Sequence, residues 1–258
     1  MVSLILAAAL ATACPNDASL GTVTFVRAAN LHQVTLGDCV DHTVSRASQQ
    51  RRLALLSPDG TSAASFDRGG SASLAADGVV LRVFSLTTGR AHNLGVGLAY
   101  PDYVAWCGGR LIFTGGGDRV ATHSKRLLIA APPDWKPRPL WNAPTRSFGS
   151  LACAPDGGSV AVLSQLSSTN ANFFATRWQL WRVGLDGSHS LLDSPPPGYA
   201  DESPLWIAGG RALAFVRERD GKGALVLLRN GRISAPIASL GFRRGYYGHR
   251  DWQLTWHA

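Results

Sequence analysis

The fold is decided by one stretch, which reads FGSLACAPDGGSVAVL over residues 148–163 and, after a polar loop, RWQLWRVGLDGSHSLLD over residues 177–193. Two short apolar runs flank the turn Ala154-Pro155-Asp156-Gly157. Proline presets φ, aspartate bonds its own backbone, and glycine accepts a positive φ, so this tetrapeptide predicts a tight turn between two strands.

The second half of the stretch predicts two more strands. Residues 178–183 alternate between apolar and polar side chains, as a half-exposed strand does. Asp186-Gly187 is a two-residue hairpin signal, and residues 190–192 supply the strand that follows it. The whole stretch therefore predicts one unit of four short strands.

The same pattern recurs along the chain with a period near 50 residues. The positions that we take as equivalent are spaced by 50, 47, 53 and 50 residues. They are Leu56, Trp106, Cys153, Trp206 and Trp256. Several short strands per unit at such a period are typical of a β-propeller.

The last copy breaks off at Ala258, and residues 22–26 and 31–38 resemble the strands that it lacks. We therefore predict an all-β protein, a single propeller of four-stranded blades, with the C-terminal strand entering the blade begun by the N-terminus. Such closure removes open sheet edges. The spacing favours five blades, and six remain the alternative if two units have been merged.

The turns Ser57-Pro58-Asp59-Gly60 and Ala154-Pro155-Asp156-Gly157, each followed by an apolar strand, resemble the TolB-like (WD40-like) propeller repeats of bacterial envelope proteins. The resemblance covers about residues 20–258, and residues 125–135 and 198–204 are similar to exported actinobacterial members of that group. Two copies, at Gly108-Gly109 and Gly209-Gly210, have lost the Pro-Asp-Gly turn. The resemblance implies a fold and does not select a function.

The N-terminal residues predict export. Residues 4–10 are apolar and precede Ala11-Thr12-Ala13, an A-x-A cleavage site, so we assign residues 1–13 as a signal peptide and residues 14–258 as the propeller. The positively charged start of such a peptide is absent here. Cys14 follows the cleavage site and resembles the cysteine of a lipobox, although Ala11 stands where that motif carries a larger aliphatic residue. Lipidation of Cys14 and simple secretion, periplasmic or extracellular, stay open as alternatives.

The chain has four cysteines, and an exported protein can keep disulfides. Cys107 and Cys153 end first strands in neighbouring blades, on the same face, so we predict a bond between them. Cys39 can pair with Cys14 if Cys14 is not lipidated and is otherwise free. Four buried reduced cysteines are the plainer alternative. No cysteine and histidine spacing predicts zinc.

The formal net charge is +8, and arginine supplies most of the basic residues. A basic surface attracts polyanions. Because the charges are dispersed over the blades and the protein is predicted to be exported, we expect no nucleic acid partner, and we interpret the surface first as solvated. Contact with a membrane is expected only through a lipid on Cys14.

The connections that lead into the first strands are longer than the turns that follow them, and in a propeller they gather around one mouth of the central channel. Loops on a rigid scaffold commonly carry function. The candidate ligand-binding residues at this mouth are Arg51, Asp102, Arg146, Tyr199, Asp201, Glu202, Tyr246, Tyr247, His249 and Asp251.

Asp201 and Asp251 lie five residues before Trp206 and Trp256, so the repeat places them at equivalent positions. They predict either a polar recognition site, which could include a cation such as calcium, or structural ion pairs between blades with Arg51 or Arg146. We favour the ion pairs, and we predict no cofactor.

No G-x-S-x-G or H-E-x-x-H motif is present. The leading hypothesis is therefore an exported, monomeric, non-catalytic propeller that binds an envelope protein or glycan at the channel mouth. The alternatives are a propeller hydrolase or lyase with an acid/base or cation site there, and a purely structural envelope module.

Overall fold

The structure is a computed structural model, and it describes residues 14–27, 30–46, 54–66, 78–85, 88–116, 120, 122–169, 177–242 and 254–257. These residues form antiparallel sheets joined by loops and by short 3-10 turns at Ala18–Leu20, Pro101–Tyr103 and Ala208–Gly210. The predicted all-β class is confirmed.

The N-terminal sheet has the order β20-β1-β2-β3. Its strands are β20 (Thr255–His257), β1 (Thr22–Arg27), β2 (Asn30–Thr35) and β3 (Asp41–Arg46). The pairing of Thr22 with His257 and of Thr24 with Thr255 brings together the two ends of the described chain.

The next sheet has eight strands in two runs of four. The first run is β4 (Ala54–Leu56), β5 (Ser62–Phe66), β6 (Val79–Ser85) and β7 (Ala91–Gly97), and the second is β8 (Val104–Cys107), β9 (Arg110–Gly115), β10 (Arg126–Ala130) and β11 (Arg138–Pro139). The two runs are joined where β7 pairs with β9 through one residue pair, Gly97 with Gly115.

Two four-stranded sheets follow. One, here called sheet C, is β12 (Arg146–Cys153), β13 (Ser159–Leu166), β14 (Gln179–Gly184) and β15 (His189–Asp193). The other, sheet D, is β16 (Ala200–Ile207), β17 (Ala212–Arg219), β18 (Lys222–Arg229) and β19 (Arg232–Phe242). The stretch from Phe148 to Asp193 thus forms four consecutive strands, as the sequence predicts.

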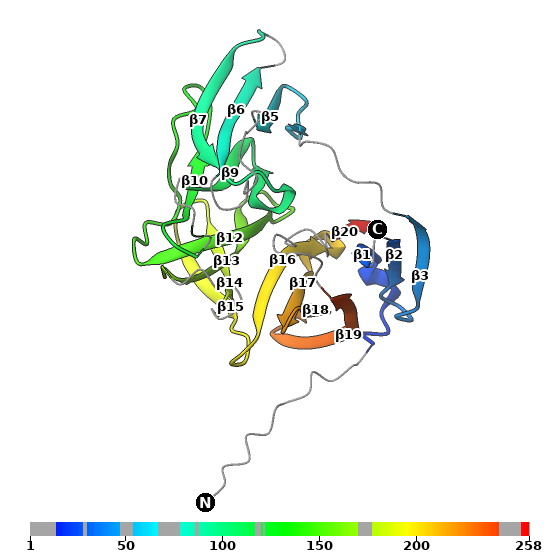
Figure 1. Cartoon of the computed structure of the whole chain (residues 1–258). Coiled ribbons are helices and arrows are strands. Elements are labelled where there is room, and N and C mark those ends of the chain that lie inside the picture. The colour runs from blue at the N-terminus through cyan, green and yellow to red at the C-terminus, as the bar shows by residue number, and fades with distance from the viewer. Residues whose placement is uncertain are drawn as a thin grey trace, which may run out of the picture.

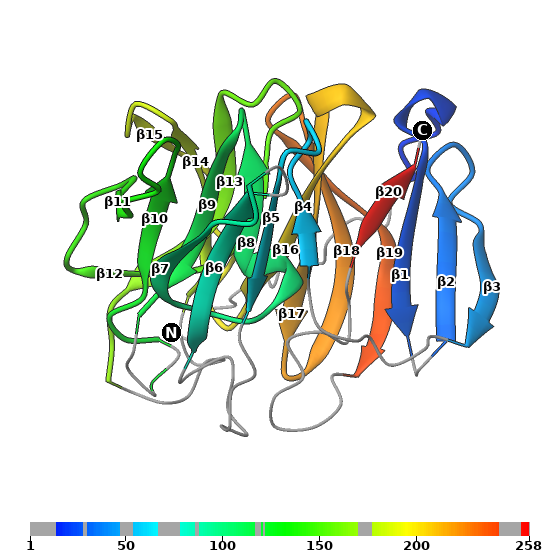
Figure 2. The ribbon, with the colours of Figure 1, turned by 90° about the horizontal axis from the view of Figure 1, so that it is seen from above.

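The sheets follow one another in chain order around a common centre (Figure 1), and their strands run between two opposite ends of the molecule (Figure 2). The hydrophobic core lies in the seams between neighbouring sheets. Alternation along each strand sends side chains to both faces, and apolar clusters lie between the two runs of the eight-stranded sheet, between its second run and sheet C, between sheets C and D, and between sheet D and the N-terminal sheet.

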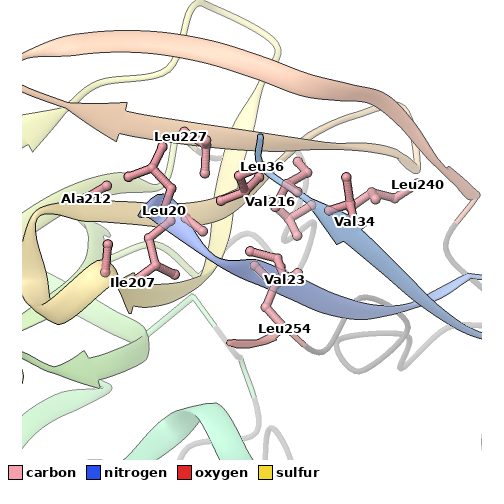
Figure 3. Packing of buried hydrophobic residues seen from close by; sticks show 13 residues of the cluster. Leu20, Val23, Val34, Leu36, Ile207, Ala212, Val216, Leu227, Leu240 and Leu254 are labelled. Atoms are coloured by element: carbon pink, nitrogen blue, oxygen red, sulfur yellow. The ribbon is translucent and has the colours of Figure 1, made fainter. Parts of the chain in front are cut away.

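The seam between sheet D and the N-terminal sheet shows this packing (Figure 3). Leu20, Val23 and Val34 from the N-terminal part meet Ile207 and Val216 from sheet D, and each is fully buried. A separate cluster, which includes Leu163, Trp178 and Phe215, fills the seam between sheets C and D.

The inner strands of adjacent units are also tied by specific bonds. The indole Nε1 of Trp106 donates to the carbonyl oxygen of Leu55 at 2.9 Å, and the Nε1 of Trp206 donates to that of Ala152 at 3.3 Å. Leu55 and Ala152 each precede a residue that the sequence repeat treats as equivalent, so the repeat register is visible in the packing.

Both disulfides involve cysteines that the sequence pairs. Cys107 on β8 bonds Cys153 on β12 with their Cα atoms 5.4 Å apart, as predicted, and this bond joins neighbouring inner strands. Cys14 bonds Cys39 with a Cα separation of 5.7 Å, which is the pairing expected without lipidation at Cys14. Residues 1–13, the expected signal peptide, lie outside the described residues. No helix among the described residues is long and apolar enough to cross a membrane.

Candidate functional site

Among the candidate residues that the sequence predicts at the channel mouth, the one that the structure defines best is Asp201, near the start of β16. It faces Arg217 of β17 in the strand register. The Arg217 Nε donates to Asp201 Oδ1 at 2.7 Å, and its Nη2 donates to Oδ2 at 3.0 Å. The Asp201 side chain is fully buried. Two parallel charge-assisted bonds make this a bidentate ion pair inside the protein.

A second carboxylate shares the same guanidinium. The Nη2 of Arg217 also donates to Oδ2 of Asp193, the last residue of β15 in sheet C. Arg217 therefore bonds a carboxylate in its own sheet and one in the neighbouring sheet. We call these three residues the Arg217 clamp.

Burial dominates the electrostatics of the clamp. Loss of solvent raises the pKa of the Asp201 carboxyl to about 7, and the negative charge of Asp193 acts in the same direction, whereas the Arg217 guanidinium opposes the rise. The two carboxylates in turn raise the pKa of Arg217 although its own burial lowers it. The guanidinium thus stays charged, and the clamp holds two acids on one cation.

The clamp fits the structural interpretation of Asp201, with a different partner from those considered at the sequence level. Arg51 lies outside the described residues. Arg146 turns to the face of sheet C, where its Nε donates to Ser164 Oγ at 2.8 Å and its Nη2 to Gln179 Oε1 at 3.1 Å. Its guanidinium carbon lies 4.9 Å from the centre of the Trp181 ring. The predicted ion pair between Asp201 and Arg146 is therefore wrong. Burial lowers the pKa of the Arg146 guanidinium.

A chain of hydrogen bonds links three successive units. Ser203 Oγ donates to Asp102 Oδ2 at 3.1 Å, and the Ser203 backbone N–H donates to Ser150 Oγ at 2.9 Å. Asp102 precedes β8, Ser150 lies on β12 and Ser203 on β16. This polar chain thus connects the inner strands of three units through side chains of which Ser150 and Ser203 are buried.

A break in strand pairing places Ser203. The register between β16 and β17 shifts between Glu202 and Leu205, and Ser203 has a φ of 51°, in the left-handed region that non-glycine residues seldom adopt. Pro204 has no N–H to give to the ladder, so a bulge at this point follows from the sequence. Glu202, just before the shift, is also buried.

Tyr199 lies at the entrance to sheet D, just before β16. The guanidinium carbon of Arg219 lies 5.3 Å from the Tyr199 ring centre, within the range of a cation–π contact, and its Nη1 lies 3.4 Å from the phenol oxygen. These two side chains line a groove with a volume of about 390 Å³.

The structure thus describes five of the ten candidate mouth residues. Asp102 belongs to the polar chain, and Glu202 directly precedes Ser203 of that chain. Asp201 belongs to the clamp, and Tyr199 lines the groove. Arg146 lies on sheet C, where it bonds Ser164 and Gln179. The other candidates lie outside the described residues. They are Arg51, Tyr246, Tyr247, His249 and Asp251. Within the described part of the chain, no three His, Cys, Asp or Glu side chains are grouped so that they could hold a metal ion.

The sequence did not single out Arg217, Asp193, Ser150 or Ser203. Arg217 sits in an ordinary strand, and only the register between β16 and β17 shows that it faces Asp201. Pro204 was the one available signal for the bulge that positions Ser203.

Comparison with known proteins agrees with this architecture. No protein-family model and no curated protein sequence matches the chain. Among solved structures, a TolB protein of Agrobacterium tumefaciens matches 92% of this chain and 87% of its own, with 15% identity and a TM-score of 0.51. An oligogalacturonate lyase of Vibrio parahaemolyticus matches 86% of this chain with 13% identity and a TM-score of 0.50.

TolB of Acinetobacter baumannii matches 86% of this chain with 14% identity and a TM-score of 0.47. The chain spans 54% of that TolB protein and 63% of the lyase. Of these three neighbours, the two with a TM-score of 0.50 or more are a TolB protein and a lyase, each at most 15% identical to this chain, so the likeness defines the fold alone. The chain has a TolB-like β-propeller fold.

Proposed function

We propose that this protein is an exported, non-catalytic β-propeller that binds an envelope protein or polymer through the loops at its channel mouth. The observation that carries the proposal is the burial of the Asp201 side chain and its ion pair with Arg217. This carboxylate was one of the candidates for an acid/base or cation site at the mouth, and it is fully buried and bound by both of its oxygens to Arg217. Such a group braces the scaffold that presents the mouth loops.

The proposal includes a ring of five four-stranded blades. The three four-stranded sheets and the two runs of the eight-stranded sheet supply the units, and the pairing of β20 with β1 supports closure of the N-terminal blade by the C-terminal strand. A ring of this kind gives a rigid base for variable loops, which is the usual arrangement of a binding scaffold.

Export is supported by the two disulfides, because such bonds persist in oxidising compartments. The bond between Cys14 and Cys39 leaves no thiol at Cys14 to carry a thioether-linked lipid. We therefore propose a secreted or periplasmic protein that begins at Cys14 after removal of residues 1–13, and not a lipoprotein. Mass spectrometry of the exported protein tests this directly, since a lipidated Cys14 would contradict it.

The binding function is tested by chemical cross-linking in the envelope of the producing cell, with quantitative mass spectrometry of captured proteins and glycans. The test variant replaces Tyr199, Tyr246 and Tyr247 with serine at the predicted mouth. The matched control is Asp156→Ser, at the turn between β12 and β13, where the carboxylate is exposed.

We expect one component to be captured by the wild type and by the control and to be lost in the mouth variant. Equal capture by all three proteins, or no specific capture by the wild type, would overturn the proposal. Both variants are first checked for export and for a wild-type melting temperature, so that loss of capture is not loss of folding.

A further inference from the structure

One face of sheet C brings together an arginine, two tryptophans and two leucines. Residues directly opposite each other in an antiparallel pair point to the same face. The register places Arg146 opposite Leu166. It also places Trp181 opposite Leu191, and alternation along β13 and β14 puts both pairs on one face. Trp141, from the segment between β11 and β12, packs on Trp181 with the ring centres 5.1 Å apart. We call these five residues the Arg146 patch.

The neighbouring unit that faces the patch has a short outer strand. That strand, β11, has only two residues, whereas the outer strands of sheets C and D have five and eleven. Residues 132–139 contain four prolines, which lack the N–H that a strand ladder needs, so the sequence itself limits β11. Two large aliphatic side chains stay open to solvent on this face of sheet C, since Leu191 is 47% and Leu166 is 69% exposed.

The guanidinium in the patch bonds only neutral groups of the described chain. Its Nε and Nη2 donate to Ser164 Oγ and Gln179 Oε1. Burial lowers the pKa of Arg146, and no carboxylate among the described residues opposes that shift. Arg146 is therefore a partly buried cation that has no counter-charge within the part of the chain that the structure describes. Such a group favours a ligand that brings a negative charge.

The two indole rings hold the guanidinium and leave some of its donors available. The guanidinium carbon lies 4.9 Å from the centre of the Trp181 ring and 5.5 Å from that of Trp141, within the range of cation–π contacts. An arginine has five N–H groups in one plane, and contact with a ring face leaves the groups at the edge of that plane able to bind a carboxylate. The patch thus holds an anion-binding group between apolar side chains.

We propose that the Arg146 patch docks a segment of a partner protein in which an aspartate or glutamate is flanked by aliphatic residues. The carboxylate binds Arg146, and the aliphatic side chains pack on Leu166 and Leu191. Arginine and tryptophan are the residue types that most often dominate the energy of a protein interface. This inference rests on the proposed function and deepens it, by selecting a protein as the ligand and by naming the chemistry that the patch recognises.

The aromatic faces of the patch favour a protein over a glycan. A sugar ring binds by stacking on an open aromatic face. Here His189 stacks on Trp141 with the ring centres 4.1 Å apart, and the Arg146 guanidinium lies over Trp181. The apolar groups that stay open are the aliphatic side chains of Leu166 and Leu191, which suit the aliphatic side chains of a peptide.

The test begins with random dodecapeptides displayed on phage and selected against the full exported protein. We expect the selected sequences to share an aspartate or glutamate next to leucine, isoleucine or valine. Each selected peptide is then synthesised with a fluorescent label, and its affinity for the purified protein is measured by fluorescence polarisation. Binding should weaken with added salt, because the central contact is between opposite charges.

A double-mutant cycle then locates the carboxylate. Replacing the acidic residue of the peptide by its amide should weaken binding to the wild type at least about tenfold and should have little effect on binding to Arg146→Gln. Leu191→Ser should also weaken binding at least about tenfold. The matched control is Arg182→Gln, which removes an exposed arginine on the other face of β14 and should leave the affinity unchanged.

A wild-type melting temperature is required of each variant. If Arg146→Gln lowers it, Leu166→Ser and Leu191→Ser carry the test, because both side chains are exposed and their replacement leaves the core intact.

The inference is overturned if no peptide is selected, if the selected peptides lack an acidic residue, or if they bind the patch variants as tightly as the wild type. A tetrasaccharide of alternating glucuronate and N-acetylglucosamine that displaces the labelled peptide more effectively than the unlabelled peptide does would also overturn it, by assigning the patch to glycans. The cross-linking experiment varies other residues in the native envelope, so either experiment can fail while the other succeeds.

Discussion

The indole Nε1 of Trp206 lies 3.3 Å from the carbonyl oxygen of Ala152 and bonds the inner strand of sheet D to that of sheet C. The bond from Trp106 to Leu55 repeats this relationship two units earlier. In the seam between these two, the repeat carries Cys153 in place of tryptophan. There the disulfide between Cys107 and Cys153 joins the inner strands β8 and β12. The chain thus ties three successive seams at comparable positions by two kinds of bond.

Replacement of Trp206 by phenylalanine should destabilise the protein by about 1 kcal/mol, because the ring is largely retained while the Ala152 carbonyl loses its donor. Trp106→Phe should cost a similar amount. Since the two bonds lie in different seams, the double variant should show the sum of the two effects. Urea denaturation followed by circular dichroism measures these free energies, and an unchanged midpoint in both single variants would contradict the assignment.

Removal of the Cys107–Cys153 disulfide should lower the free energy of unfolding by about 2–5 kcal/mol, since the bond closes a long loop of the unfolded chain. The double variant Cys107→Ser, Cys153→Ser is compared with the wild type under oxidising conditions. Peptide mapping without reduction should recover Cys107 linked to Cys153 and Cys14 linked to Cys39. Recovery of any other pairing would contradict the structure.

Replacement of Arg217 by methionine should destabilise the protein by about 3–5 kcal/mol, because it leaves two carboxylates together in a buried seam without their cation. The triple variant Asp193→Asn, Arg217→Met, Asp201→Asn removes the acids as well. It should be more stable than the single variant, as measured by urea denaturation. If both variants lose the same free energy, charge is not the source of the effect.

The raised pKa of Asp201 predicts a particular pH dependence. An acid whose folded pKa exceeds its unfolded value binds an extra proton in the folded state, so its contribution to stability is present below about pH 4 and is lost as pH rises toward about 7. The loss should be on the order of a few kcal/mol. In Asp201→Asn this component should disappear from the free energy of unfolding measured between pH 4 and 8. An identical pH profile in the variant would refute it.

Asp17 should behave in the opposite way. Its hydrogen bonds from Ser19 and its contact with Arg229 lower its pKa to about 2. It therefore contributes stability above about pH 4 that is lost as pH falls toward 2. Acid unfolding of Asp17→Asn should depend less steeply on pH than that of the wild type in this range, when followed by tryptophan fluorescence. Equal slopes would show that the Asp17 contacts do not contribute.

The fold was open to prediction because its signals are local. A Pro-Asp-Gly turn, an Asp-Gly hairpin and an apolar run each specify a short segment, and the recurrence of this pattern near every 50 residues orders the segments into units. The Cys107–Cys153 bond followed from the same register, since both residues end equivalent strands.

The contacts of the candidate site were harder to predict from the sequence, because they depend on the registers between strands. Asp201 was found from the repeat, but its partner Arg217 is identified only by the pairing of β16 with β17, and Asp193 enters from another sheet. The left-handed conformation of Ser203 arises from a bulge whose position a sequence pattern does not fix. Long-range polar contacts of this kind carry no periodic signature.

The pairing of β1 with β20 has a consequence for biosynthesis. Thr22 to Thr24 are made early, and their partners, Thr255 to His257, are made some 230 residues later. During synthesis, β1 therefore carries an unsatisfied edge that the nascent chain itself cannot cover. The N-terminal sheet is complete only after β20 has been made, so the open edge of β1 is exposed to wrong pairing until then.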